Sequence, residues 1–270
     1  MNFKTFLVII STTICFSSCS PKHYVSIVAH RGYWDCPQGG YSHNSIASLK
    51  AACEKGFWGA EFDVNMTADG VLLVFHDNKI DGKVINYTNK KEFDYYRLPN
   101  NETIPTLDEY LTVAKRYPKT KLVFELKEHL SDELENRAVA ASVEALKRQN
   151  LFHPSRVMFI SFSLSECRKL AEAAPGFTVQ YLEKDQTMDV LKQNKVNGID
   201  LQFKAFLNRP SWIKEARENN FSINSWTVNK EEDIKAVLNL DIDQITTNAP
   251  ELVRSIIKQS KNLKERKATK

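Results

Sequence analysis

Short apolar runs alternate with amphipathic segments along nearly the whole chain, and this alternation limits the possible folds more than any other feature. Eight apolar runs are expected to be strands, and they begin near residues 25, 59, 121, 156, 177, 198, 221 and 242. Helices are expected at 43–55, 106–116, 131–149, 163–174, 187–194, 210–219, 230–239 and 249–260. Repeated strand–helix units with short connections form parallel sheets. Eight units favour a closed (β/α)8 TIM barrel, and no G-x-G-x-x-G motif supports a dinucleotide-binding fold.

One segment interrupts the alternation. The run 71–75 is expected to be an extra strand after the second barrel strand, and residues 77–105 are polar without a clear period. In a barrel this segment would form a long loop over the mouth, where substrates are commonly selected. Its basic and aromatic residues are either contacts to an anionic substrate or ordinary loop residues; they are Lys90, Lys91, Tyr95, Tyr96 and Arg97.

Polar side chains gather where the first expected strands end. His30 and Arg31 follow the run 25–29, Glu61 and Asp63 end the next strand, and His76 follows 71–75. The carboxyl ends of parallel strands carry the active site in barrels and open sheets. Two histidines, an arginine and two acids at that edge indicate a metal-assisted phosphoester site.

The two carboxylates are the strongest indication of a metal. Glu61 and Asp63 are two residues apart on a strand, so they share a face at a spacing of roughly 7 Å. Two like charges about 6 Å apart repel by roughly 2–3 kcal/mol at an effective dielectric of 20. A divalent cation removes that cost, and oxygen ligands suit Ca²⁺ or Mg²⁺. Glu125 is available as a third acid, and Lys127 shares its face of the strand at 121–126.

The order of these motifs resembles that of the glycerophosphodiester phosphodiesterase family, which shares its barrel with the phosphatidylinositol-specific phospholipases C. The resemblance covers nearly all of the chain after residue 25. Beyond His-Arg, Glu-x-Asp and His-Asp, the matching motifs are Thr67-Ala-Asp69-Gly70, Glu125-Leu-Lys127, Ser161-Phe162, Trp226-Thr-Val-Asn229 and Thr246-Thr-Asn248-Ala-Pro250.

The resemblance implies a metal-dependent hydrolysis of glycerophosphodiesters to glycerol phosphate and an alcohol. It implies that His30 and His76 act as acid and base, in an order left open, and that Arg31 binds the phosphate. It assigns the metal to Glu61, Asp63 and Glu125, and Lys127 to the phosphate region. Trp226 either walls the substrate pocket or is a barrel-core residue. The nucleophile is either water or an adjacent hydroxyl of the substrate.

Three departures from the family pattern leave the alcohol of the substrate open. Ser42-His43-Asn44-Ser45 stands in place of Pro-Glu-Asn-Thr, Asn248 stands where Asp is common, and residues 78–85 contain no Arg. Three alternative functions are a phospholipase acting on membrane lipid, a glycosidase using Glu61 and Glu125, and a non-catalytic binding lipoprotein on a degenerate barrel. The glycosidase leaves both histidines unexplained, and the binding protein would not need a complete set of catalytic residues.

The first 19 residues resemble a bacterial lipoprotein signal. Lys4 precedes a mostly apolar stretch too short for a spanning helix, which needs about 20 residues, and Phe16-Ser17-Ser18-Cys19 resembles a lipobox. Lipid on Cys19 would anchor the protein to a membrane, facing the periplasm or the cell exterior. Residues 20–257 are then one barrel domain, and 258–270 form a basic tail that is either solvated or bound to anionic lipid.

Net charge and cysteine spacing bear on the possible partners, metal ligands and disulfides. The net charge is only +4, and basic residues are not interleaved with aromatic ones, so a nucleic-acid partner is not expected. Cys36, Cys53 and Cys167 remain after the signal, with no metal-type spacing. Free buried thiols are preferred over a Cys36–Cys53 disulfide. The sequence does not indicate an oligomeric state.

Overall fold

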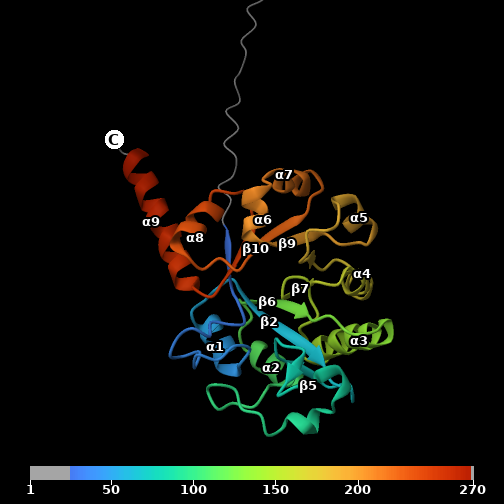
Figure 1. Ribbon diagram of the computed structural model, residues 1–270. Coiled ribbons are helices and arrows are strands. Elements are labelled where there is room, and N and C mark those ends of the chain that lie inside the picture. The colour runs from blue at the N-terminus through green and yellow to red at the C-terminus, as the bar shows by residue number, and fades with distance from the viewer. Residues whose placement is uncertain (1–24, 269–270) are drawn as a thin grey trace, which may run out of the picture.

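The computed structural model describes residues 25–268, with side chains to residue 262, and its centre is a closed parallel barrel (Figure 1). Its eight strands are β1 (Ser26–Ala29), β2 (Gly59–Met66), β6 (Lys121–Leu126), β7 (Val157–Ser161), β8 (Val179–Tyr181), β9 (Gly198–Gln202), β10 (Ser222–Trp226) and β11 (Gln244–Thr247). Pairing runs in sequence order from β2 to β11, and β1 closes the ring by pairing with both ends. The predicted (β/α)8 TIM barrel is confirmed.

Helices surround the barrel close to their predicted positions. They are α1 (Ile46–Glu54), α2 (Leu107–Ala114), α3 (Asp132–Arg148), α4 (Leu164–Ala173), α5 (Met188–Gln193), α7 (Ser211–Glu218), α8 (Glu231–Val237) and α9 (Pro250–Ala268). Ser131 and Ser163 accept hydrogen bonds from the first turns of α3 and α4, as their capping patterns predict.

Two helices differ from the prediction. The short helix α6 (Phe203–Asn208) follows β9 directly and was not predicted. Helix α9 continues to Ala268 instead of ending near residue 260. Its buried stripe, which includes Val253 and Ile256, lies in the first two turns. Lys, Glu, Arg and Ala are good helix formers, so the helix extends beyond the last packed turn and projects from the barrel in Figure 1.

The segment after β2 is more ordered than a plain loop. β3 (Leu72–Val74) is the predicted extra strand, and it runs antiparallel to β2. The structure then adds β4 (Lys79–Ile80), β5 (Lys83–Val84) and the 3₁₀ turns η1 (Ile85–Tyr87) and η2 (Lys90–Phe93). These elements pack on a small apolar core of their own, formed by Leu73, Ile80, Ile85, Phe93, Leu98 and Ile104. Its apolar residues are spaced irregularly, so periodicity did not reveal them.

The alternation along each strand separates two layers of side chains. On β2 and β6, Phe62 and Phe124 face the helix layer, where their ring centroids are 5.0 Å apart. Val123 belongs to the separate apolar cluster that fills the barrel interior together with Val28, Met158, Ile160 and Leu182. Because side chains alternate with a period of two, Glu125 shares the inner face with Val123. The acids therefore sit above an apolar floor.

Candidate active site

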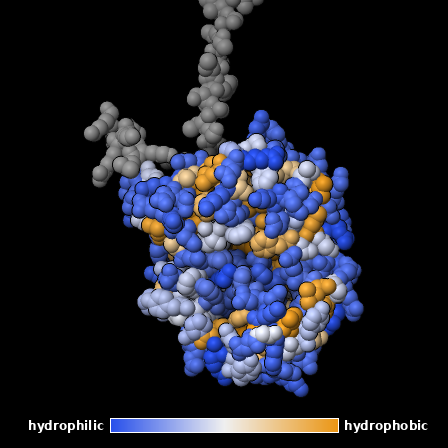
Figure 2. Space-filling model, viewed as in Figure 1, coloured by the Kyte–Doolittle hydropathy of each residue, from blue (hydrophilic) through white to orange (hydrophobic). Residues whose placement is uncertain are grey.

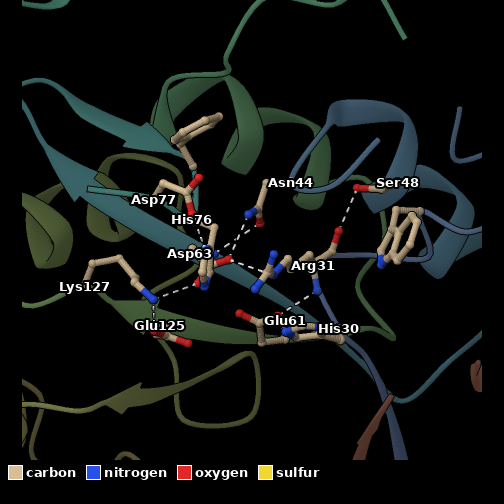
Figure 3. Close-up of polar contacts among 12 residues, drawn as sticks. His30, Arg31, Asn44, Ser48, Glu61, Asp63, His76, Asp77, Glu125 and Lys127 are labelled. Atoms are coloured by element: carbon tan, nitrogen blue, oxygen red, sulfur yellow. Dashed lines mark hydrogen bonds and ion pairs between the residues drawn. The ribbon is translucent and has the colours of Figure 1, made fainter. Parts of the chain in front are cut away.

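Glu61, Asp63 and Glu125 form one buried cluster at the centre of the site (Figure 3). Asp63 on β2 and Glu125 on β6 are direct neighbours in the parallel register. The three side chains each offer a carboxylate oxygen, and these oxygens lie within 4.8 Å of one another. The residues are 2 %, 1 % and 8 % exposed, so solvent does not screen their mutual repulsion.

The electrostatics of the cluster fit a divalent cation. Burial and the neighbouring Asp63 and Glu125 raise the pKa of Glu61 well above its usual value. Burial and Asp63 raise the pKa of Glu125 to about 7. One carboxylate oxygen of Glu61, Oε1, is buried without a hydrogen-bond partner. Closely spaced acids with an unsatisfied buried oxygen are the donor set that Ca²⁺ or Mg²⁺ requires.

Two cations lie beside the acids. Lys127 Nζ is 2.5 Å from Glu125 Oε1 and 3.4 Å from Asp63 Oδ1, and Arg31 Nε is 3.7 Å from Asp63 Oδ2. Burial alone would raise the pKa of Asp63, but Lys127, His76 and Arg31 outweigh it and lower that pKa. Asp63 therefore stays ionised, and the charge repulsion within the cluster acts mainly on Glu61 and Glu125, whose pKa values are raised.

Asn44 was not singled out from the sequence, although it lies in the tetrapeptide that departs from the family pattern. It precedes α1 and holds a left-handed backbone conformation with a φ of 54°. Its Nδ2 donates to Asp63 Oδ2 at 2.8 Å, and its Oδ1 accepts from the Asp63 backbone N–H at 3.2 Å. The residue therefore orients one carboxylate of the cluster.

His30 follows β1 and lies at the edge of the acid cluster. Its Nδ1 is 2.7 Å from Asn248 Oδ1, and its Nε2 is 4.0 Å from Glu61 Oε2. Burial, and then the charge of Arg31, lower the pKa of His30 to about 4. The imidazole is therefore neutral at neutral pH. Asn248 in turn is held by Asn229, whose side-chain oxygen accepts from the Asn248 backbone N–H. Asn229 does not cap the next helix, α8, whose N-cap residue is Lys230.

His76 follows β3 and is more open to solvent. Its side chain is 39 % exposed, and its Nδ1 is 2.7 Å from Asp77 Oδ1. Asn65 on β2 donates to the backbone oxygens of Phe75 and Asp77, at 2.7 Å and 3.3 Å. Strand β2 thus positions His76 as well as two of the acids.

A cavity of about 100 Å³ brings the predicted residues together. Its lining includes seven of them, namely His30, Arg31, Glu61, His76, Glu125, Lys127 and Trp226. Asp63 is not among the lining residues. Residues 78–105 contribute none of the lining. The side chains of Lys90, Tyr95 and Arg97 bond within that segment, so they are surface residues of the insertion rather than pocket residues.

Trp226 and Asp200 form the side of this pocket contributed by β9 and β10. Trp226 Nε1 donates to the backbone oxygen of Asp200 at 2.9 Å, and its ring meets that of Phe162 edge-on at 5.7 Å. Trp226 lines the pocket and also packs against the barrel interior, so it is both a pocket-wall residue and a barrel-core residue. Asp200 was missed from the sequence. It is 1 % exposed, and burial and Glu125 raise its pKa well above the usual value.

The cysteines and His43 lie outside the acid cluster. Cys36, Cys53 and Cys167 are buried free thiols, so no Cys36–Cys53 disulfide forms and the preferred alternative is confirmed. Burial raises the pKa of Cys53 to about 11, as expected for an unreactive thiol. His43 is exposed, and its ring lies edge-on to that of Trp34 at 4.0 Å. It therefore does not take the place of a carboxylate in the cluster.

The fold and the site define a class of enzyme, the TIM-barrel phosphodiesterases, and comparison with known proteins gives the family. Residues 30–252 match the model of the glycerophosphoryl diester phosphodiesterase family, and the chain belongs to that family. Among curated relatives, a glycerophosphodiester phosphodiesterase of Caldanaerobacter subterraneus is 24 % identical over 249 residues, covering 86 % of this chain and 98 % of the relative. The chain is accordingly a phosphoric diester hydrolase.

Solved structures agree with this assignment. A glycerophosphodiester phosphodiesterase from Parabacteroides distasonis is 36 % identical, with a TM-score of 0.84, and the match covers 88 % of this chain and 99 % of that one. A phosphodiesterase from Oleispira antarctica, solved with the product sn-glycerol-3-phosphate, is 25 % identical with a TM-score of 0.74, covering 86 % and 96 % of the two chains.

Proposed function

We propose that the chain hydrolyses glycerophosphodiesters to glycerol phosphate and an alcohol, with Ca²⁺ or Mg²⁺ held by Glu61, Asp63 and Glu125. The observation that carries the proposal is one pocket in which two histidines and an arginine surround a buried, electrostatically strained acid cluster. The product bound by the Oleispira antarctica relative is consistent with this substrate class.

The acidic and the basic side chains of the pocket have different roles toward the phosphate. Glu61, Asp63 and Glu125 would hold a divalent cation, whose positive charge would offset the negative charge that builds up on the phosphate oxygens. Arg31 offers a planar fork to the same group, and its backbone is held beside the acid cluster because its N–H donates to Glu61 Oε2 at 2.6 Å. Lys127, which directly follows β6 and is bonded to Glu125, adds a second positive charge.

The two histidines differ in a way that assigns their roles. His30 is neutral and its Nε2 faces the acid cluster, so we assign it as the base that takes a proton from the nucleophile. His76 lies on the other side of the pocket, donates its Nδ1–H to the Asp77 carboxylate and is more exposed than His30. We therefore assign His76 as the acid that protonates the leaving alkoxide.

An adjoining cavity has room for the alcohol portion of the diester. It measures about 260 Å³ and shares Phe162, Leu182 and Trp226 with the first cavity. Its lining carries both signs of charge, with Glu183 and Lys204 among the residues. The alcohol is therefore expected to extend past Trp226 into this second cavity.

A phospholipase that inserts into membrane lipid has little support. The face shown in Figure 2 has scattered hydrophobic residues rather than one continuous patch. Tyr95-Tyr96 and Phe206-Leu207 are the candidate apolar pairs in the loops. Tyr95 and Leu207 are exposed, but Phe206 is fully buried and the Tyr95 hydroxyl donates to Asp81. A glycosidase would leave His30 and His76 without a role, and a non-catalytic lipoprotein would not need the full set of catalytic residues.

We further propose that Cys19 carries a lipid that anchors the protein to a membrane, facing the periplasm or the cell exterior. Cys19 lies outside the described residues, and the proposal rests on the sequence of the first 19 residues. Among residues 25–268, no helix has both the length and the apolar character needed to cross a membrane.

A product assay with a panel of glycerophosphodiesters tests the proposed hydrolysis. The full chain should release glycerol phosphate, and His30→Gln and His76→Gln should each lower kcat on the order of 10²–10⁴-fold. His153→Gln is the matched control, because His153 is an exposed histidine whose side chain bonds only to Ser155 among the described residues. The proposal fails if no diester on the panel yields glycerol phosphate, or if either histidine variant keeps the wild-type rate.

A further inference from the structure

The side chain of Asn248 joins His30 to an indole that the proposed chemistry does not use. Trp34 lies in the loop after β1, and its Nε1 is 3.1 Å from Asn248 Oδ1. The same oxygen is 2.7 Å from His30 Nδ1. The backbone holds His30 and Asn248 close together, because the His30 N–H donates to the oxygen of Thr247, the last residue of β11.

This geometry determines which nitrogen of His30 carries the proton. An indole N–H can only donate, so the end of the Asn248 amide that faces Trp34 must be its oxygen. That oxygen can only accept, so His30 Nδ1 must donate to it. In a neutral imidazole the other nitrogen is then unprotonated. His30 Nε2, 4.0 Å from Glu61, is thereby left with a free lone pair at the cavity.

We propose that Trp34 is a positioning residue that fixes the tautomer of His30 through the amide of Asn248. The inference rests on the proposed role of His30 as the base, since only the Nδ1–H tautomer can accept a proton at Nε2. An amide needs such a partner because its two ends differ, whereas either oxygen of a carboxylate would accept from His30. Because position 248 is Asn rather than Asp, a donor such as the Trp34 N–H is needed to turn the amide oxygen toward His30.

The rest of the surroundings do not fix the amide. Asn229 holds the backbone of Asn248, but the Asn248 Nδ2 has no hydrogen-bond partner among the described residues. In the flipped orientation, an NH₂ group would face the Trp34 N–H and leave two donors opposed. Loss of a hydrogen bond together with an unpaired donor disfavours that orientation by roughly tenfold or more. Without the indole this preference disappears.

The ¹⁵N chemical shifts of the His30 ring test the proposal, because they distinguish a protonated from a bare imidazole nitrogen. The full chain is labelled and measured at mildly alkaline pH, with the His30 signals identified by their absence in His30→Gln. The wild type should show a protonated Nδ1 and a bare Nε2. Trp34→Phe, which keeps the ring but loses the donor, should show a mixture of tautomers.

Turnover and a second substitution separate positioning from packing. Trp34→Phe should lower kcat by about twofold or more, because roughly half of the amides lose the productive orientation. Adding Asn248→Asp should restore both the Nδ1–H tautomer and kcat, since both carboxylate oxygens accept. Trp212→Phe, which changes a partly buried indole on α7, is the control and should alter neither quantity.

Two results would overturn the proposal: a single Nδ1–H tautomer retained in Trp34→Phe, or a double variant that stays as perturbed as Trp34→Phe alone. The spectra do not depend on turnover. If His30→Gln keeps full activity, the proposed catalytic role fails, whereas the link from Trp34 to the tautomer is judged separately by the shifts.

Discussion

Asn44 and Asp63 exchange two hydrogen bonds, one from the amide to the carboxylate at 2.8 Å and one from the Asp63 backbone N–H to the amide oxygen at 3.2 Å. The pair is buried and joins the loop before α1 to strand β2, which carries two acids of the cluster. With one oxygen bound by Asn44, the other lies 3.4 Å from Lys127 Nζ. The carboxylate orientation is therefore set before any cation binds.

Asn44→Ala should weaken cation binding by roughly 10- to 100-fold, the usual effect of losing a group that orients a metal ligand. Calorimetric titration of the purified chain with Ca²⁺ and Mg²⁺ measures this. Asn136→Ala, at an exposed position on α3, should bind like the wild type. Unchanged affinity in Asn44→Ala would show that the amide does not support a metal ligand.

Arg31→Lys should lower kcat/KM by about tenfold or more, because lysine keeps the charge but loses one of two hydrogen bonds to the phosphate. Arg31 has a φ of 56°, and its backbone position is fixed by Glu61 and Ser48. Steady-state kinetics on a glycerophosphodiester measure the change. Wild-type kinetics in this variant would exclude a bidentate contact.

The stabilising effect of the cation should grow as the pH rises through about 7. The pKa of Glu125 is raised from 4.5 to about 7, so the folded metal-free chain holds a proton that the unfolded chain releases. Stability from this carboxyl is therefore present below pH 4.5 and is lost as the pH passes 7. Cation binding requires the ionised form and offsets that loss.

Thermal unfolding at a series of pH values, with and without Ca²⁺ or Mg²⁺, measures this linkage. The increase in Tm caused by the ion should be small in acid and largest above pH 7. In Glu125→Gln the pH dependence near 7 should shrink, since the titrating group is gone. An increase in Tm that is equal at all pH values would contradict a cluster strained by its own charges.

The barrel could be predicted from the sequence because its signal is repeated. Each of the eight strands is a short apolar run followed by an amphipathic helix, and errors at single boundaries do not change the count. The insertion 77–105 could not be predicted in the same way, because it is held by apolar residues at irregular spacing. The end of α9 was missed because residues 258–262 are mostly exposed and show no apolar stripe, yet the helix continues through them.

The site could be predicted as far as the residues that follow strands. Period-two alternation placed Glu61 and Asp63 on one face, and the parallel register brought Glu125 beside them. Residues that act through another side chain were missed. Asn44 and Trp34 reach their partners from a loop after β1, and no local pattern indicates that reach. The Asp200 environment depends on β9 lying across the barrel from β2.

Cys19→Ser should abolish acyl labelling and membrane retention if the cysteine carries the anchor. Two acyl chains suffice for stable anchoring, whereas one is marginal. Protein that starts at Ser20 should be released from membranes and hydrolyse small diesters at the same rate as the anchored form. If Cys19→Ser still fractionates with membranes, the proposed anchor is wrong, and another part of the chain must bind the lipid.

Turnover by the metal-stripped chain tests most directly whether Glu61, Asp63 and Glu125 hold the ion on which hydrolysis depends. A chelator should abolish release of glycerol phosphate, and Ca²⁺ or Mg²⁺ should restore it. Glu61→Gln should lose cation affinity and activity together while remaining folded. Full activity in the chelated wild-type chain, confirmed to be free of metal, would contradict the proposed mechanism.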